Sequence, residues 1–300
     1  DNMGYFAYNP VSGKLKAYPQ INYYDGHGDK QPMLEDSKGN IWVPGLGGRF
    51  FIRNTGTDQV DSFTINSNVA RPMPPQAIIT AIYEDGQGVF WIGTQEGFVK
   101  CLFDFKSRSP QRVDWYYNDI STRHSLNYNN VSCFLDDPAT PGKYIWIGTK
   151  GGGLNRMDKS NGLFSHLSTN DGLPDDVVYT MLADGAGNIW GSTNKGLFCM
   201  QPPQKGRTGW SFRTFTKADG LQDDEFNTGA SARLPNGKLA FGGVNGINIF
   251  KPADVLTTGF EPKVFITDIL VNNQALSPGD GTGVLQKTIE LSSEIRLTHL

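Results

Sequence analysis

The chain has 300 residues, of which 38% are hydrophobic, and its formal net charge is −3. So small a charge implies no strongly acidic or basic partner, and without a basic stripe the chain is not expected to bind nucleic acid. The 36 glycines and the aromatic side chains (18 Phe, 11 Tyr and 6 Trp) are typical of tight turns around a bulky core. No segment has sustained helical periodicity, which favours an all-β fold.

The stretch 177–198 shows the unit from which the chain is built. Residues 178–182 predict a strand, 184–188 a Gly/Asn turn, 189–190 the start of a second strand, and 194–196 a second turn. The unit recurs around Trp42, Trp91, Trp146 and Trp190, and in degenerate form around Ala240. Repeats of roughly 40–50 residues, each forming a four-stranded meander, indicate a β-propeller.

In chain order, residues 4–19 are expected to form the outer two strands of a partial blade. Five blades follow, at about 33–64, 77–117, 131–167, 177–216 and 229–251. We place the β-propeller at 1–259 and the start of a β-sandwich at 260–300, where the run 264–271 has a different character. Because the chain opens inside a repeat, we expect it to be a piece of a longer protein.

The three cysteines, Cys101, Cys133 and Cys199, lie in or beside apolar runs without metal-ligand spacing. They are interpreted as buried core residues, and no metal or cofactor is predicted. The sequence shows neither a signal peptide nor a membrane span.

Meander geometry assigns the turns to two ends of the blades. The short Asp-Gly-type turns share one end and are interpreted as structural. The long connectors share the other end with the turns at 45–49, 94–97, 149–153, 193–196 and 243–246. We call that second end the connector face. Variable loops on a repeated frame are where binding surfaces are usually built.

The repeat resembles the two-component regulator propeller repeat of the periplasmic sensor region of bacterial hybrid two-component systems. The resemblance depends on 182–184 with 187–190, on 145–149 with 151–154, and on the connector 170–174. Residues 262–273 resemble the first strand of the immunoglobulin-like (Y_Y_Y-type) domain that follows these propellers. Ala240, Pro44 and the long turn at 136–143 depart from the pattern.

The resemblance implies a periplasmic sensor that binds an oligosaccharide and signals to a histidine kinase elsewhere in the parent. That parent would be membrane-anchored and would form a receptor dimer through its C-terminal region. This part of the chain would not be an enzyme. Signalling would couple ligand binding to a change near 251–262, which requires different affinities for two states.

The aromatic rings and the Asn, Lys or Arg side chains of the connector face are the groups expected to bind a sugar. The predicted ligand-binding residues are Tyr23, Tyr24, Arg49, Arg123, His124, Tyr128, Asn129, Lys150, Asn194, Phe226, Asn227 and Asn245. His27, Arg71, Asn130 and Lys195 lie on the same predicted face. For each residue alone, an ordinary loop role is the competing interpretation.

Three alternatives remain open from sequence. Carboxylates in the connectors 168–176 and 217–228 could hold Ca²⁺, although no 12-residue calcium loop is present. A propeller lyase or hydrolase would need a general base in a cleft, with His27 and His124 as candidates. A propeller that only binds protein partners is the third alternative.

Overall fold

The computed structural model describes residues 4–22, 32–65, 77–203, 209–256, 268–271, 273–285, 287–289 and 294. The chain divides into two compact units, 1–252 and 253–300, and each is described by itself. Tyr23 and Tyr24, like His27 and Arg71, lie outside the described residues.

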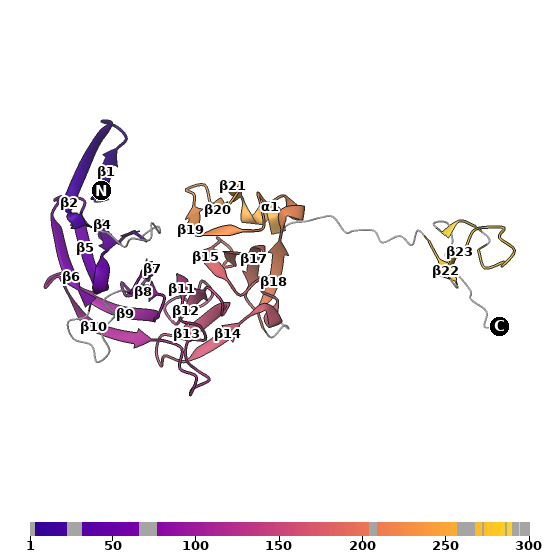
Figure 1. Ribbon diagram of the computed structural model, residues 1–300, viewed down its shortest axis with the longest axis horizontal. Coiled ribbons are helices and arrows are strands. Elements are labelled where there is room, and N and C mark those ends of the chain that lie inside the picture. Colours follow the sequence, from indigo (N-terminus) through magenta and orange to yellow (C-terminus); the bar gives the residue numbers. More distant parts are fainter. Residues whose placement is uncertain are drawn as a thin grey trace. The chain divides into compact units, whose positions relative to one another are not determined.

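The first unit is a β-propeller of five blades, each an antiparallel sheet whose strands follow one another in sequence (Figure 1). This confirms the predicted fold class. Four of the sheets have four strands. They are β3 (Leu34–Glu35), β4 (Asn40–Pro44), β5 (Arg49–Asn54) and β6 (Val60–Thr64); β7 (Ile79–Glu84), β8 (Phe90–Thr94), β9 (Gly97–Asp104) and β10 (Ser109–Tyr116); β11 (Val131–Asp136), β12 (Tyr144–Thr149), β13 (Leu154–Asp158) and β14 (Phe164–Leu167); β15 (Val178–Ala183), β16 (Ile189–Thr193), β17 (Gly196–Gln201) and β18 (Ser211–Phe215).

The two ends of the unit depart from the four-stranded pattern. A hairpin of β1 (Gly4–Asn9) and β2 (Lys14–Asn22) precedes the first full sheet. The last sheet has three strands, β19 (Phe226–Arg233), β20 (Leu239–Gly243) and β21 (Gly246–Phe250). A short helix, α1 (Pro252–Leu256), follows it, which the all-β prediction did not include.

A buried Asp–Trp pair explains why the same turn recurs. Trp91 Nε1 donates to Asp85 Oδ2 at 2.9 Å, and the other Asp85 oxygen accepts from two backbone N–H groups of the turn. Asp36–Trp42 and Asp184–Trp190 repeat this arrangement at 2.8 and 3.0 Å. One carboxylate thus satisfies the turn and the indole together, so the turns predicted to be structural are structural.

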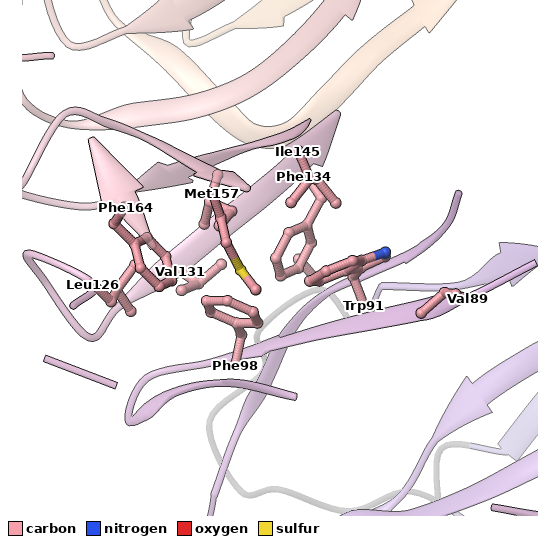
Figure 2. Close-up of a cluster of buried hydrophobic side chains, with 11 residues drawn as sticks. Val89, Trp91, Phe98, Leu126, Val131, Phe134, Ile145, Met157 and Phe164 are labelled. Carbon is pink, nitrogen blue, oxygen red and sulfur yellow. The ribbon is translucent and has the colours of Figure 1, made fainter. Parts of the chain in front are cut away.

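Apolar side chains of neighbouring sheets form cores between the blades. In the core between sheets β7–β10 and β11–β14, Trp91, Phe98 and Ile147 are fully buried. Figure 2 shows this cluster, which includes Leu126 from the connector that joins the two sheets. The connector is therefore attached to the core by its own leucine, and the residues around that leucine are fixed in place.

The second unit contains a small hairpin of β22 (Leu270–Val271) and β23 (Gln274–Ala275). Residues 264–267 of the predicted β-sandwich strand lie outside the described residues. The immunoglobulin-like interpretation of 260–300 therefore stays a prediction.

Candidate functional site: the connector face

In the connectors 118–130, 168–176 and 217–228, one repeated residue is bonded to the second-to-third-strand turn of the preceding blade. Asn129, Asp176 and Asp224 accept backbone N–H bonds through their main-chain carbonyls from Gly97 (2.9 Å), Gly151 (3.0 Å) and Gly196 (2.7 Å). These bonds confirm that the connectors and the second-to-third-strand turns share one face. Asn129, Asp176 and Asp224 are thus equivalent positions of the repeat.

The side chains of the same three residues accept hydrogen bonds from the beginning of their own connectors. Asn129 Oδ1 accepts from the backbone N–H of Asn118 at 2.6 Å, while Asp176 and Asp224 accept from Thr169 and Lys217 at 2.8 and 2.7 Å. Asn129 is thus a fastening residue of the connector, and only its amide NH2 remains to reach a ligand.

Tyr128 is the most prominent aromatic side chain of the described connectors. Its side chain is 44% exposed, and its ring lies against Gly151, where an added Cβ would come within 3.0–3.3 Å of three ring atoms. At Gly152 an added Cβ would lie 2.4 Å from Asn127 Oδ1 and 2.6 Å from Tyr128 Cβ. Gly151 therefore packs against the ring of Tyr128 and Gly152 against its Cβ, and a side chain at either position would displace the tyrosine.

Polar groups adjoin this ring. Lys150 donates its backbone N–H to the carbonyl of Asn130 at 2.8 Å, which places the lysine beside the Tyr128–Asn130 segment. Asn130 Oδ1 is buried and lacks a hydrogen-bond partner among the described residues. We call Tyr128, Asn129, Asn130 and Lys150, with the support of residues 151–152, the tyrosine platform. An exposed ring beside a cation and amides is suited to the apolar face and hydroxyls of a sugar.

A second polar cluster surrounds the turn between β16 and β17. Tyr179 Oη donates to Asn194 Oδ1, and Lys195 forms an ion pair with Asp175 at 3.3 Å. Burial raises the pKa of Tyr179, and the charges of Glu225 and Asp175 raise it further. The phenol therefore stays protonated at neutral pH and acts as a hydrogen-bond donor.

A third cluster lies at the turn between β20 and β21. Asn245 donates its backbone N–H to Gln222 Oε1 at 2.6 Å and its amide to the Gln222 carbonyl at 3.3 Å. Asn227 is exposed. Phe226 is only 1% exposed, so its ring packs inside the blade and offers no face to a ligand. Its apolar character reflects the start of β19, which begins earlier than we predicted.

Three predicted basic residues lie apart from the tyrosine platform. Arg49 is bonded to Ser62 Oγ at 3.1 Å and lies over the Phe51 ring. His124 contacts Phe164 of β14, with its Nδ1 3.5 Å from the Phe164 carbonyl. Because β14 is the outermost strand of its sheet, His124 and the neighbouring exposed Arg123 lie toward the rim of the blade.

The connector carboxylates are occupied by backbone donors. Asp171 and Asp219 close capping boxes with Ser168 and Thr216, around the short 3-10 turns η3 (Thr169–Asp171) and η4 (Lys217–Asp219). Nowhere in the described ranges do three His, Cys, Asp or Glu side chains gather in a way that could hold a metal ion. The clustered aspartates thus have a structural explanation as turn and cap residues.

A cavity of about 350 Å³ lies between the inner strands β7, β11, β15 and β19. No charged side chain lines it, and two of its hydroxyls, Thr80 Oγ1 and Ser132 Oγ, donate to carbonyls of the next blade at 2.5 Å. Burial raises the pKa of the Cys133 thiol at its wall to about 12, which keeps that thiol uncharged and unreactive. None of the predicted ligand-binding residues lines this cavity.

Sequence reasoning missed two residues that organise the face. Asn127 and Gln222 both follow the connector leucine, and each binds the second-to-third-strand turn of the blade that comes after its connector. Asn127 does so through the carbonyl of Gly152 at 2.6 Å. Aligning the connectors on Leu126 and Leu221 would have revealed the repeated amide. Tyr179 was missed because it lies within a predicted strand, where side chains alternate between buried and accessible faces.

Residues 73–96 match the model of the family described as "Two component regulator propeller". The chain therefore contains a stretch similar to a two-component regulator propeller repeat. "Histidine kinase P4" of Formosa agariphila is 24% identical to the chain over 262 residues, which cover 86% of this chain and 18% of that protein. This propeller therefore spans less than a fifth of its curated relative.

Solved structures agree on the fold. The extracellular domain of the putative hybrid two component system BT4673 from B. thetaiotaomicron aligns with a TM-score of 0.57 at 16% identity, over 82% of this propeller and 30% of that chain. A streptogramin B lyase aligns with a TM-score of 0.52 at 12% identity, over 82% of this propeller and 75% of that chain. At such low identities the likeness to both proteins concerns the fold alone.

Proposed function

We propose that this propeller is the ligand-sensing part of a two-component receptor, located in the periplasm, and that its connector face binds an oligosaccharide. The repeats and the similarity to a histidine kinase support the receptor assignment. The kinase would lie elsewhere in the parent protein, which would be anchored in the membrane and would signal as a dimer.

The tyrosine platform is the observation that carries the oligosaccharide proposal. A partly exposed ring that packs on Gly151, beside Lys150 and the Asn129 amide, offers stacking and hydrogen bonding in one place. The ring is already held against the backbone, so little side-chain freedom is lost on binding. The described helices are all too short or too polar to cross a membrane.

The test is a thermal-shift and calorimetric screen of the purified chain against neutral, acidic and sulfated oligosaccharides. With the ligand that binds, Tyr128→Ala should weaken affinity about tenfold or more, which corresponds to about 1.4 kcal/mol. Tyr8→Ala is the matched control, because Tyr8 is a 64% exposed tyrosine on the β1–β2 hairpin. Equal loss in both variants, or no loss in Tyr128→Ala, would contradict the assignment of the platform.

A screen in which no oligosaccharide shifts the melting temperature would count against a sugar ligand in these residues. A protein partner would then become the leading alternative, and Tyr128→Ala against Tyr8→Ala would locate its contact in the same way. Conversion of a saccharide during incubation would instead indicate an enzyme.

A further inference from the structure

A second cavity lies at the end of the blades opposite the connector face. It has a volume of about 210 Å³ and lies between sheets β3–β6 and β7–β10. Phe103 and Phe105, whose rings are 5.1 Å apart and nearly perpendicular, line one side, and Ile52 contributes to the other. Sites for drug-sized ligands usually measure roughly 300–1,000 Å³, so this cavity suits a single ring.

The charged groups at this cavity carry an excess of positive charge. Arg108 is paired with Asp61 across the two sheets. Lys38 is exposed, with its Nζ 3.6 Å from the centroid of the Phe105 ring, and it forms no ion pair with the carboxylates that the structure describes. A ligand carboxylate would therefore meet one uncompensated ammonium group at the edge of an aromatic wall.

The amides of the cavity are already used by the protein. Asn40 donates to Asp36 and accepts from Asn54 Nδ2 at 2.8 Å, and Asn54 Oδ1 accepts from Gly56 and Thr57. Few groups are left to pair with the hydroxyls of a sugar. Recognition here must come from charge and from apolar ring contact instead.

We infer that this cavity is a binding site for a small ring-bearing carboxylate, with Lys38 holding the carboxylate and Phe103 and Phe105 contacting the ring. It is separate from the tyrosine platform and does not depend on an oligosaccharide binding there. The ligand would be an aromatic acid or a molecule with an equivalent apolar ring and one negative charge.

The experiment titrates the 300-residue chain with benzoate, benzyl alcohol and acetate, followed by calorimetry or by NMR of the ligand. Benzoate should bind saturably, whereas benzyl alcohol, which lacks the charge, and acetate, which lacks the ring, should bind at least tenfold more weakly. Absence of saturable benzoate binding, or binding of either analogue at the same affinity, would overturn the inference.

The Lys38→Met variant tests whether benzoate binds at this cavity. Methionine keeps an apolar chain over Phe105 but removes the ammonium, so benzoate affinity should fall about tenfold or more while the melting temperature without ligand stays unchanged. Lys106→Met is the matched control, because Lys106 is an exposed lysine of the β9–β10 turn that does not line the cavity. Unchanged affinity in Lys38→Met, or an equal loss in Lys106→Met, would assign benzoate binding to another place.

Discussion

Two neighbouring interfaces of the propeller are stabilised differently, although their residues occupy the same places in the repeat. Between sheets β7–β10 and β11–β14, the Lys159 ammonium, only 6% exposed, contacts Asp85 at 2.7 Å and Asp136 at 2.5 Å. Asp136 also accepts the backbone N–H of Gly86 at 2.9 Å. This interface is a buried polar network.

The next interface lies between sheets β11–β14 and β15–β18. It lacks both the donor and the acceptor of the bond that joins the Gly86 N–H to Asp136. Ala183 occupies the place of Asp136, and Pro138, which has no N–H, occupies the place of Gly86. Aromatic packing replaces the bond, because the Trp146 and Trp210 rings lie 5.0 Å apart with Arg156 over both. Arg156 also forms an ion pair with Asp137, and Trp146 Nε1 lacks the aspartate partner that Trp42, Trp91 and Trp190 have.

At this interface donor and acceptor are lost together, whereas at the following one only the acceptor is lost, because Arg233 occupies the place of Asp136 and the exposed Gly185 keeps its N–H. A buried carboxylate without its N–H, or a buried N–H without its carboxylate, is costly, whereas removing both can be nearly neutral. The last blade follows the same rule in its turn, where Leu234 and Ala240 replace the aspartate and the tryptophan.

The largest effect is expected from Lys159→Met in the polar interface. The substitution leaves Asp85 buried without its cation, which should destabilise the fold by about 3–5 kcal/mol. Urea unfolding at pH 7 measures the effect. Lys143→Met, which removes an exposed lysine from the same sheet, is the control and should change stability by less than about 1 kcal/mol.

The pH dependence sharpens this test. Burial alone would raise the pKa of Asp85, but the hydrogen bonds from Lys159 and Trp91 outweigh it, so the pKa lies below its usual value. In the wild type, ionised Asp85 therefore contributes to the free energy of unfolding above the pKa of the unfolded state, about 3.9. This contribution is lost as the pH falls from there through the lower pKa of the folded state. In Lys159→Met the pKa of Asp85 should rise instead, so the stability difference should shrink from pH 7 toward pH 4. A difference independent of pH would mean that Lys159 acts by packing alone.

A second test compares glycines at the two ends of the blades. Gly152→Ala should force the 118–130 connector away from its turn and cost about 1–3 kcal/mol, because the new Cβ would lie 2.4 Å from Asn127 Oδ1. Gly185→Ala is the control, since no atom lies within 4 Å of its added Cβ. Thermal unfolding checks both variants, and equal melting temperatures would contradict the close fit of the connector.

Two substitutions should introduce the equivalent of the Gly86–Asp136 hydrogen bond into the interface between sheets β11–β14 and β15–β18. Ala183→Asp alone should destabilise by about 1 kcal/mol, because the carboxylate has no N–H to accept from. Pro138→Ala restores that N–H, so the double variant should recover a coupling energy of about 1 kcal/mol in a double-mutant cycle. A coupling near zero would show that the longer turn at 137–143 places this N–H out of reach.

The smallest effect concerns the turns between the third and fourth strands. Arg108 has a φ of 53°, at the turn position where Gly162 has a φ of 74° in the next blade. Arg108→Gly should relieve about 1 kcal/mol of backbone strain and lose an exposed ion pair worth at most about 1 kcal/mol. We expect a net change below about 1 kcal/mol in thermal unfolding. A loss of 2 kcal/mol or more would show that the Arg108–Asp61 pair is a main brace of its interface.

The tyrosine platform illustrates how far sequence could lead. The connector face, Tyr128, Asn129 and Lys150 were predicted from the position of the turns, because a meander of known strand number assigns each turn to an end of the blade. The same reasoning placed Phe226 on this face, where the structure buries it, and grouped His124 with the platform residues although it lies against the outermost strand β14. The edge of the blade along which a connector runs is a tertiary property that strand periodicity does not encode.

The sequence by itself determined the blade and its repetition, because the Asp–Trp turn, the glycines and the strand alternation are local features that each repeat carries within about fifty residues. Only the tertiary structure decided which carboxylate meets which cation across a blade interface. It also decided that the Tyr128 side chain packs on Gly151 and Gly152, and that Lys38 lies over the ring of Phe105 from the next sheet. These contacts join residues 23 to 74 positions apart, and their energy depends on burial and distance, which only the packed sheets define.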